Sequence, residues 1–135
     1  LARSLGAPEE QVREAILEAV DGFQLDTAFQ KPVIVSETGG AAKQGVHGGR
    51  LDAWTEELQA AIYETEVGAL IDRKGSPVRG LSPWILKDFR SPMRLNSRMQ
   101  SYWNRKGIVS PEGERKQAFF VLQRRYAEHA ERTGR

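Results

Sequence analysis

The stretch that decides the fold is Lys31-Pro-Val-Ile-Val-Ser-Glu-Thr-Gly-Gly40. Its three β-branched residues, Val33, Ile34 and Val35, form a short and continuous apolar run. Such a run is typical of a strand buried on both faces, so it predicts a strand of a parallel sheet. Glu37 follows directly, and α/β enzymes place their chemistry at the C-terminal ends of such strands. The alternative, that Glu37 merely ends the strand and faces water, stays open at this point.

The composition predicts one soluble globular domain. The chain has 135 residues, of which 39% are hydrophobic and 28% charged, as in ordinary globular proteins. No apolar run approaches the roughly 18 residues of a membrane span, and a net charge of +2 does not by itself indicate nucleic-acid binding. The sequence has no cysteine, which excludes disulfides and thiolate metal sites.

The first residues suggest a segment of a longer protein. The chain begins Leu-Ala-Arg-Ser rather than with Met and carries no signal-peptide pattern. We therefore expect residues 1–135 to be one partial domain of a parent protein. The parent's location, whether cytoplasmic, periplasmic or secreted, is not predicted, and a homo-oligomeric parent is left open.

Apolar periodicity predicts alternating helices and strands. The expected elements are a helix over 8–20, a strand over 33–36, a helix over 53–72, a strand over 78–86 and a helix over 114–129. Asp52 is the expected N-cap of the 53–72 helix, whose expected buried stripe is Trp54, Leu58, Ala61, Ile62, Thr65 and Ala69. The last helix is expected to bury Ala118, Phe119, Leu122 and Tyr126, with residues 132–135 frayed. This alternation favours parallel βα units.

A glycine-rich loop over 38–51 follows the first strand. It has no Gly-Lys-Ser/Thr ending, so it fits no phosphate-binding pattern and no cofactor is expected. A long loop after a strand carboxylate is typical of an active-site wall or lid. His47 is expected to be a loop or supporting residue rather than a metal ligand, because the only other histidine is His129 and no ligand cluster exists.

A second feature is the basic loop from Lys87 to Lys106. It contains six cations against the single acid Asp88, with three interleaved aromatic residues: Phe89, Tyr102 and Trp103. Three interpretations stay open, namely a solvated loop, a nucleic-acid contact and a pocket for an anionic small molecule. Trp84, near the end of the second strand, is either a core residue or an apolar platform under a sugar.

Three segments, in order, carry a resemblance to a known family. They are Lys31-Pro-Val-Ile-Val-Ser-Glu-Thr-Gly39, Trp84-Ile-Leu-Lys-Asp-Phe89, and Asn104-Arg-Lys-Gly-Ile108 followed by Lys116-Gln-Ala-Phe-Phe120. Together they resemble the C-terminal part of the catalytic barrel in glycoside hydrolase family 2, and its β-glucuronidases most closely. The resemblance covers about residues 23 to 126.

The resemblance implies a fold and a set of site residues. The fold would be α/β, with this chain supplying about strands 7 and 8 of a (β/α)8 TIM barrel. Glu37 would be the catalytic nucleophile, and Trp84 would form the floor of the sugar subsite. Asn104 and Lys106 would bind the sugar carboxylate; Arg105, between them, and His47 complete the candidate substrate-binding residues. One departure is Thr38, where many relatives carry an aromatic residue.

The resemblance also implies that part of the machinery lies elsewhere. The family's acid/base is a Glu preceded by Asn, and the sequence contains no Asn-Glu pair. We therefore expect the 135-residue chain alone to be inactive. The implied partner is a carbohydrate, a β-glucuronide or alternatively a β-galactoside, with no metal, nucleic acid or membrane. Two other hypotheses are a non-catalytic module that binds anionic glycans and a structural domain without a site.

Overall fold

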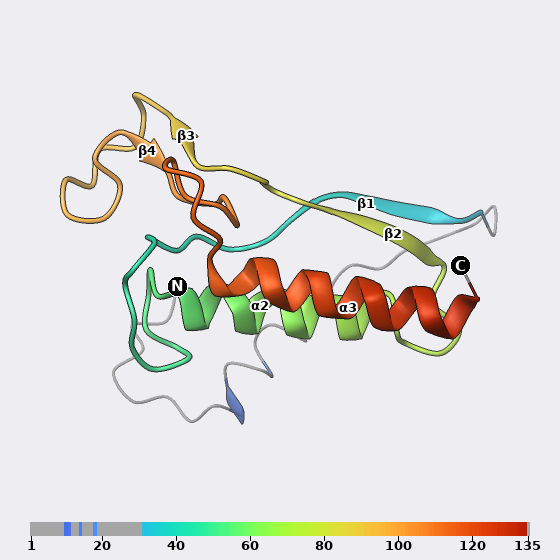
Figure 1. Cartoon of the computed structure of the whole chain (residues 1–135). Helices are drawn as coiled ribbons and strands as arrows, with labels where there is room; N and C mark the ends of the chain where they lie inside the picture. The colour runs from blue at the N-terminus through green and yellow to red at the C-terminus, as the bar shows by residue number, and fades with distance from the viewer. Residues whose placement is uncertain (1–9, 12–13, 15–17, 19–30, 135) are drawn as a thin grey trace.

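Two parallel strands joined by a helix form the centre of the fold (Figure 1). A computed structural model describes residues 10–11, 14, 18 and 31–134. β1 (Val33–Thr38) leads into α2 (Glu56–Leu70) and then into β2 (Val78–Pro83). The strands pair in parallel, with Val33 opposite Val78 and Thr38 opposite Pro83. Because parallel neighbours require a crossover connection, this arrangement confirms the predicted βα alternation and a mixed α/β fold.

The remaining elements follow β2. A short antiparallel pair, β3 (Phe89–Arg90) and β4 (Trp103–Asn104), lies within the basic loop, and α3 (Gln117–Thr133) ends the described chain. Figure 1 shows α2 and α3 side by side along one face of the strand pair. The β3–β4 hairpin projects beyond the C-terminal ends of β1 and β2, at the end of the molecule where both helices begin. The long loops therefore gather at the strand ends that carry Glu37 and Trp84.

The core lies between the two helices and the strand pair. Its fully buried members are Tyr63, Val67, Ile108, Ala118 and Leu122. Partly buried side chains from β2 and both helices surround them. Burial of such apolar surface contributes about 25 cal/mol per Å², so this cluster stabilises the packing of α3 against α2.

Helix α2 begins three residues later than predicted, and its N-cap is Thr55 rather than Asp52. The Thr55 hydroxyl accepts a hydrogen bond from Leu58 N at 3.2 Å. Asp52 instead accepts from Gly49 N at 2.8 Å within the preceding turn. Trp54 has a left-handed backbone, with φ of 71°, so the helix cannot extend back through it. The Asp52 prediction was therefore wrong.

The buried stripe of α2 also differs from the prediction. The predicted apolar residues are half-buried, whereas the fully buried positions are Glu56, Gln59, Ala60, Tyr63 and Val67. Hydrogen bonding as well as hydrophobicity determines which face of α2 is buried, because Glu56 and Gln59 bond backbone atoms of the loop that follows β1 and Tyr63 bonds the last residue of β1. Periodicity does not reveal these partners. The predicted stripe of α2 therefore lies beside the stripe of fully buried residues.

Strand β1 is not buried on both faces in the part of the chain that is described. Ile34 is 73% exposed, and Val33 and Val35 are half-buried. β2 is the one strand with which β1 pairs among the described residues. β1 also runs through Glu37 to Thr38, and β2 ends at Pro83 instead of Leu86.

Helix α3 runs from Gln117 to Thr133, beginning and ending later than predicted. Ala118 and Leu122 are buried as expected, while Tyr126 is 42% exposed. Helix geometry continues to Thr133, and Gly134 closes the helix in the left-handed conformation that favours glycine; the fraying expected over residues 132–135 stays a prediction, and residue 135 lies outside the described residues. Arg132 is also paired with Asp72.

The predicted helix over 8–20 is only partly described. Its four described residues, Glu10, Gln11, Glu14 and Glu18, are helical. Its predicted apolar face, Val12, Ala15, Ile16, Ala19 and Val20, lies outside the described residues, as does the connection over 23–30.

Candidate functional site

The C-terminal ends of β1 and β2 are joined directly. Trp84 N donates a hydrogen bond of 2.7 Å to Thr38 O, one residue beyond Glu37. Glu37 itself is exposed near the end of β1, and Trp84 is half-buried just after β2. The structure therefore brings these two predicted site residues to the same edge of the strand pair.

The backbone after Glu37 is held by α2. Tyr63 Oη donates to Thr38 O at 3.2 Å, and Thr38 Oγ1 donates to the Glu66 carboxylate at 2.5 Å. Burial raises the pKa of Glu66, and the Thr38 hydrogen bond partly opposes that rise. Burial also raises the pKa of Tyr63, so its hydroxyl remains a donor at neutral pH. Thr38, the departure from the family pattern, thus anchors the turn that follows Glu37.

The segment Asn104–Gly107 lies on the other side of the Trp84–Ile85 backbone. Ile85 N donates to Lys106 O at 3.1 Å, and Ile108 N donates to Ile85 O at 3.0 Å. Residues 84 and 85 therefore bridge the end of β1 on one side and the Lys106 segment on the other. Trp84 also packs edge-on against Phe89, with ring centroids 6.3 Å apart.

Asn104 and Lys106 are placed together by a local turn. Asn104 is 6% exposed and its Oδ1 accepts from Lys106 N at 3.0 Å. This bond fixes the orientation of the Asn104 amide, so that Oδ1 faces the turn and the donor Nδ2 is directed away from Lys106 N. Lys106 is half-buried. The turn therefore places an amide side chain and a lysine side chain two residues apart on one segment.

Arg105 and His47 each hold a carboxylate of the protein. Arg105 lies 3.4 Å from Asp88, and its guanidinium sits over Trp103 at 5.6 Å from the ring centroid. His47 Nδ1 is 2.9 Å from Glu57 at the start of α2. The hydrogen bond to Glu57 raises the pKa of His47. Both side chains therefore bind carboxylates within the protein itself.

A buried ion pair that the sequence did not predict lies behind this segment. Lys116 Nζ contacts the two carboxylate oxygens of Asp88 at 3.0 and 3.1 Å, and both side chains are fully buried. Burial raises the pKa of Asp88 and lowers that of Lys116, against their mutual attraction. Asp88 also accepts from Gly107 N at 2.8 Å. The one sequence feature that could have indicated this ion pair was Asp88, the single acid among the six cations of the basic loop.

A third unpredicted residue is Gln59, which is fully buried on α2. Its Nε2 donates to Gly40 O at 2.9 Å and to Gly107 O at 3.1 Å. A polar residue on the inward face of a helix could have indicated such a role, but its partners are 19 and 48 residues away. Sequence spacing therefore could not identify them.

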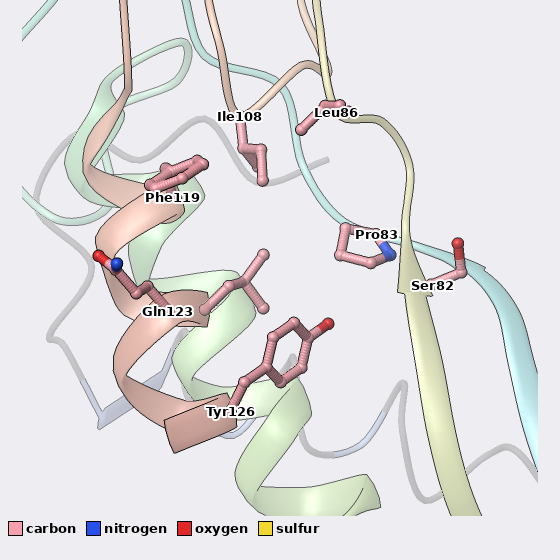
Figure 2. Close-up of a pocket in the computed structure, with 8 residues that line it drawn as sticks. Ser82, Pro83, Leu86, Ile108, Phe119, Gln123 and Tyr126 are labelled. Carbon is pink, nitrogen blue, oxygen red and sulfur yellow. The ribbon is translucent and has the colours of Figure 1, made fainter. Parts of the chain in front are cut away.

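An apolar groove of about 460 Å³ lies between the end of β2 and α3 (Figure 2). Figure 2 shows Phe119 and Tyr126 of α3 on one side of this space and Pro83 and Leu86, at and after the end of β2, on the other. The lining side chains are Ser82, Pro83, Leu86, Ile108, Phe119, Leu122, Gln123 and Tyr126. None of the six predicted site residues is among them, so the groove is a packing surface separate from the candidate site.

The described part of the chain shows neither a metal-binding cluster nor a membrane-spanning helix. Over residues 10–11, 14, 18 and 31–134, no cluster of three or more His, Asp or Glu side chains could hold a metal ion. Within the same residues, no helix combines the length and the apolar character needed to cross a membrane.

The chain is similar in sequence to β-glucuronidases. No family model matches the chain. Rat β-glucuronidase is 33% identical over 108 residues, and human β-glucuronidase is 32% identical over 108 residues. Each match covers 78% of this chain and 16% of the relative, so the chain spans about a sixth of the length of these relatives.

Solved structures give the same picture for the fold. A family 2 β-galacturonidase from Eisenbergiella tayi bound to galacturonate has a TM-score of 0.63 at 26% identity, over 73% of this chain and 17% of that one. A Ruminococcus gnavus β-glucuronidase has a TM-score of 0.70 at 24% identity, over 90% of this chain and 20% of that one. The second match shows the fold alone.

Proposed function

We propose that the chain is a β-glucuronidase-like segment of glycoside hydrolase family 2 and that it belongs to a retaining enzyme that cleaves terminal β-D-glucuronosides. In this proposal residues 1–135 form part of the catalytic domain, contributing about strands 7 and 8 of a (β/α)8 barrel. The parallel pairing of β1 with β2 and the packing of α2 against α3 support it. A complete barrel takes about 250 residues, so the other strands would come from the rest of the parent.

Glu37 is the nucleophile in this mechanism. Its carboxylate attacks the anomeric carbon as the leaving oxygen departs, and a covalent glycosyl-enzyme forms. A second carboxyl group, about 5 to 5.5 Å away, protonates the leaving oxygen and then activates the water that releases the sugar. That acid/base would be a Glu preceded by Asn, and this sequence contains no such pair.

Asn104 and Lys106 provide selectivity for a uronic acid. A lysine cation and an amide donor complement a carboxylate, and hydrogen bonds to a charged group are stronger than those between neutral groups. The hydrogen bond from Lys106 N to Oδ1 supports this role, because it orients the Asn104 amide with the donor Nδ2 directed away from the turn. Trp84 would form the floor of the sugar subsite. Arg105 and His47 support the site through Asp88 and Glu57.

The observation that carries the proposal is the hydrogen bond from Trp84 N to Thr38 O. It holds the proposed nucleophile strand and the proposed sugar platform at one edge. The test is Glu37→Gln in the full-length enzyme, which should lower kcat for an aryl β-glucuronide by several orders of magnitude. Glu114→Gln, at an exposed position on the turn before α3, is the matched control and should retain activity. Retained activity in Glu37→Gln would reject the assignment.

A second candidate substrate is a β-galacturonide. The observation that favours it is the similarity to a family 2 β-galacturonidase whose structure holds galacturonate. A lysine and an amide donor suit the carboxylate of either uronic acid. Initial rates with the two aryl uronides, measured on the same preparation of full-length enzyme, would separate the candidates.

A further inference from the structure

We propose that Gln59 and Lys116 are positioning residues that set the distance between the backbone after Glu37 and the segment carrying Asn104 and Lys106. They would thereby control selectivity for the sugar carboxylate without touching the sugar. This inference rests on the proposed function of Lys106 and extends it to two buried side chains. By the backbone after Glu37 we mean residues 39–42, which include the two carbonyl groups that these side chains contact.

Gln59 connects the two segments from α2. Its Nε2 faces three carbonyl oxygens, those of Gly40 at 2.9 Å, Gly107 at 3.1 Å and Lys106 at 3.4 Å. These acceptors fix the orientation of the amide, because the reversed amide would direct Oε1 at carbonyl oxygens. The side chain is fully buried, so water does not replace these bonds. One amide group therefore ties the Glu37 side of the site to the Lys106 side.

Lys116 makes an equivalent connection from the start of α3. Its Nζ donates to Ala42 O at 2.6 Å and to Arg105 O at 3.3 Å, besides its ion pair with Asp88. Asp88 in turn accepts from Gly107 N. The buried ammonium group thus reaches both segments, directly and through its partner carboxylate.

The two side chains act on the same pair of segments from different helices. Residues 39–42 and 104–107 also share one direct backbone bond, from Ala42 N to Arg105 O at 3.0 Å. The backbone at Gly107 packs too closely against Asp88 to carry a side chain, because an added Cβ would lie 2.2 Å from Asp88 N. The position of Lys106 relative to Glu37 is therefore set by buried groups. A displacement of about 1 Å in such an arrangement can lower a rate about 100-fold.

The test compares a uronide with its neutral counterpart in the full-length enzyme. The variants are Gln59→Met and Lys116→Met, which keep side-chain length but remove the donors. Arg124→Met is the control, because Arg124 joins α3 to Glu64 of α2 through an exposed pair. For each protein, kcat/KM is measured with aryl β-glucuronide and aryl β-glucoside after active-site titration, together with the Ki of D-glucuronate.

The positioning role predicts a loss of selectivity. Both variants should lower the glucuronide-to-glucoside ratio by about tenfold or more and weaken inhibition by D-glucuronate by a similar factor. Arg124→Met should leave both quantities within about twofold of the unmodified enzyme. Gln59→Met leaves no buried charge unpaired, so it remains informative if Lys116→Met fails to fold.

Two results would overturn different claims. Equal losses on both substrates in Gln59→Met, with an unchanged Ki for D-glucuronate, would mean that Gln59 has only a structural role and would overturn the inference. Unmodified enzyme that hydrolyses no β-glucuronide would instead overturn the proposed function itself.

Discussion

Tyr63 Oη donates a hydrogen bond of 3.2 Å to the carbonyl oxygen of Thr38, the residue that follows Glu37. Tyr63 lies in the middle of α2 and is fully buried. The same carbonyl accepts from Trp84 N at 2.7 Å. Helix α2, strand β1 and the residue after β2 therefore meet at one oxygen atom.

Gly39 is the position where this junction tolerates no side chain. Its φ is +139°, and an added Cβ would lie 2.1 Å from Tyr63 Oη. We expect Gly39→Ala to destabilise the folded protein by about 2–5 kcal/mol, since backbone strain and steric overlap act together. Chemical denaturation of the full-length enzyme measures this change.

Two variants separate the causes. Gly75 also has a positive φ, +80°, but an added Cβ meets nothing within 4 Å, so Gly75→Ala should cost only about 1–2 kcal/mol from strain. Tyr63→Phe in the Gly39→Ala background should recover part of the loss by removing the overlapping hydroxyl. A cost for Gly39→Ala no larger than that for Gly75→Ala would contradict the steric account.

Much of the strand and helix order could be predicted from the sequence. The β-branched run at Val33 predicts a strand, and the apolar spacing of α3 predicts a helix. Both signals lie within a short stretch of sequence, where residue patterns indicate secondary structure well. The pairing of the two strands followed from the alternation of elements. The position of Glu37 near the strand end followed from its place just beyond the apolar run, with one residue between them.

The contacts that organise the site could not be predicted in the same way. Lys116 and Ala42 are 74 residues apart, and Gln59 and Gly107 are 48 apart. Such pairs depend on the packed arrangement of the helices, which periodicity does not encode. The N-cap error at Asp52 has a similar origin, because the left-handed backbone of Trp54 is not visible in the residue type.

The ionisation of His47 gives a pH-dependent prediction. Its hydrogen bond to Glu57 raises its pKa above the ordinary value of 6.5. A raised folded-state pKa means that this contact stabilises the protein fully below about pH 6.5, and the contribution is lost as pH rises through the folded-state value. In Glu57→Gln, the pKa of His47 followed by NMR should fall toward its ordinary value. An unchanged titration would show that Glu57 is not the cause.

Lys106 should distinguish charged from neutral sugars. In the full-length enzyme, Lys106→Ala should lower kcat/KM for an aryl β-glucuronide by about 10- to 100-fold, because a charge-assisted hydrogen bond contributes about 1.5–3 kcal/mol. The neutral counterpart, an aryl β-glucoside, should change by only a few-fold. Lys87→Ala removes an exposed cation of the same basic loop and should have little effect. Equal losses on both sugars would argue against recognition of the carboxylate.

The most direct test of the central claim is to trap the covalent intermediate. A 2-deoxy-2-fluoro-β-glucuronosyl fluoride should inactivate the full-length enzyme, and digestion with mass spectrometry should locate the sugar. The account predicts one label per chain, on Glu37 at the end of β1, and no label in Glu37→Gln. A label on any other residue, or release of the product with inverted anomeric configuration, would contradict it.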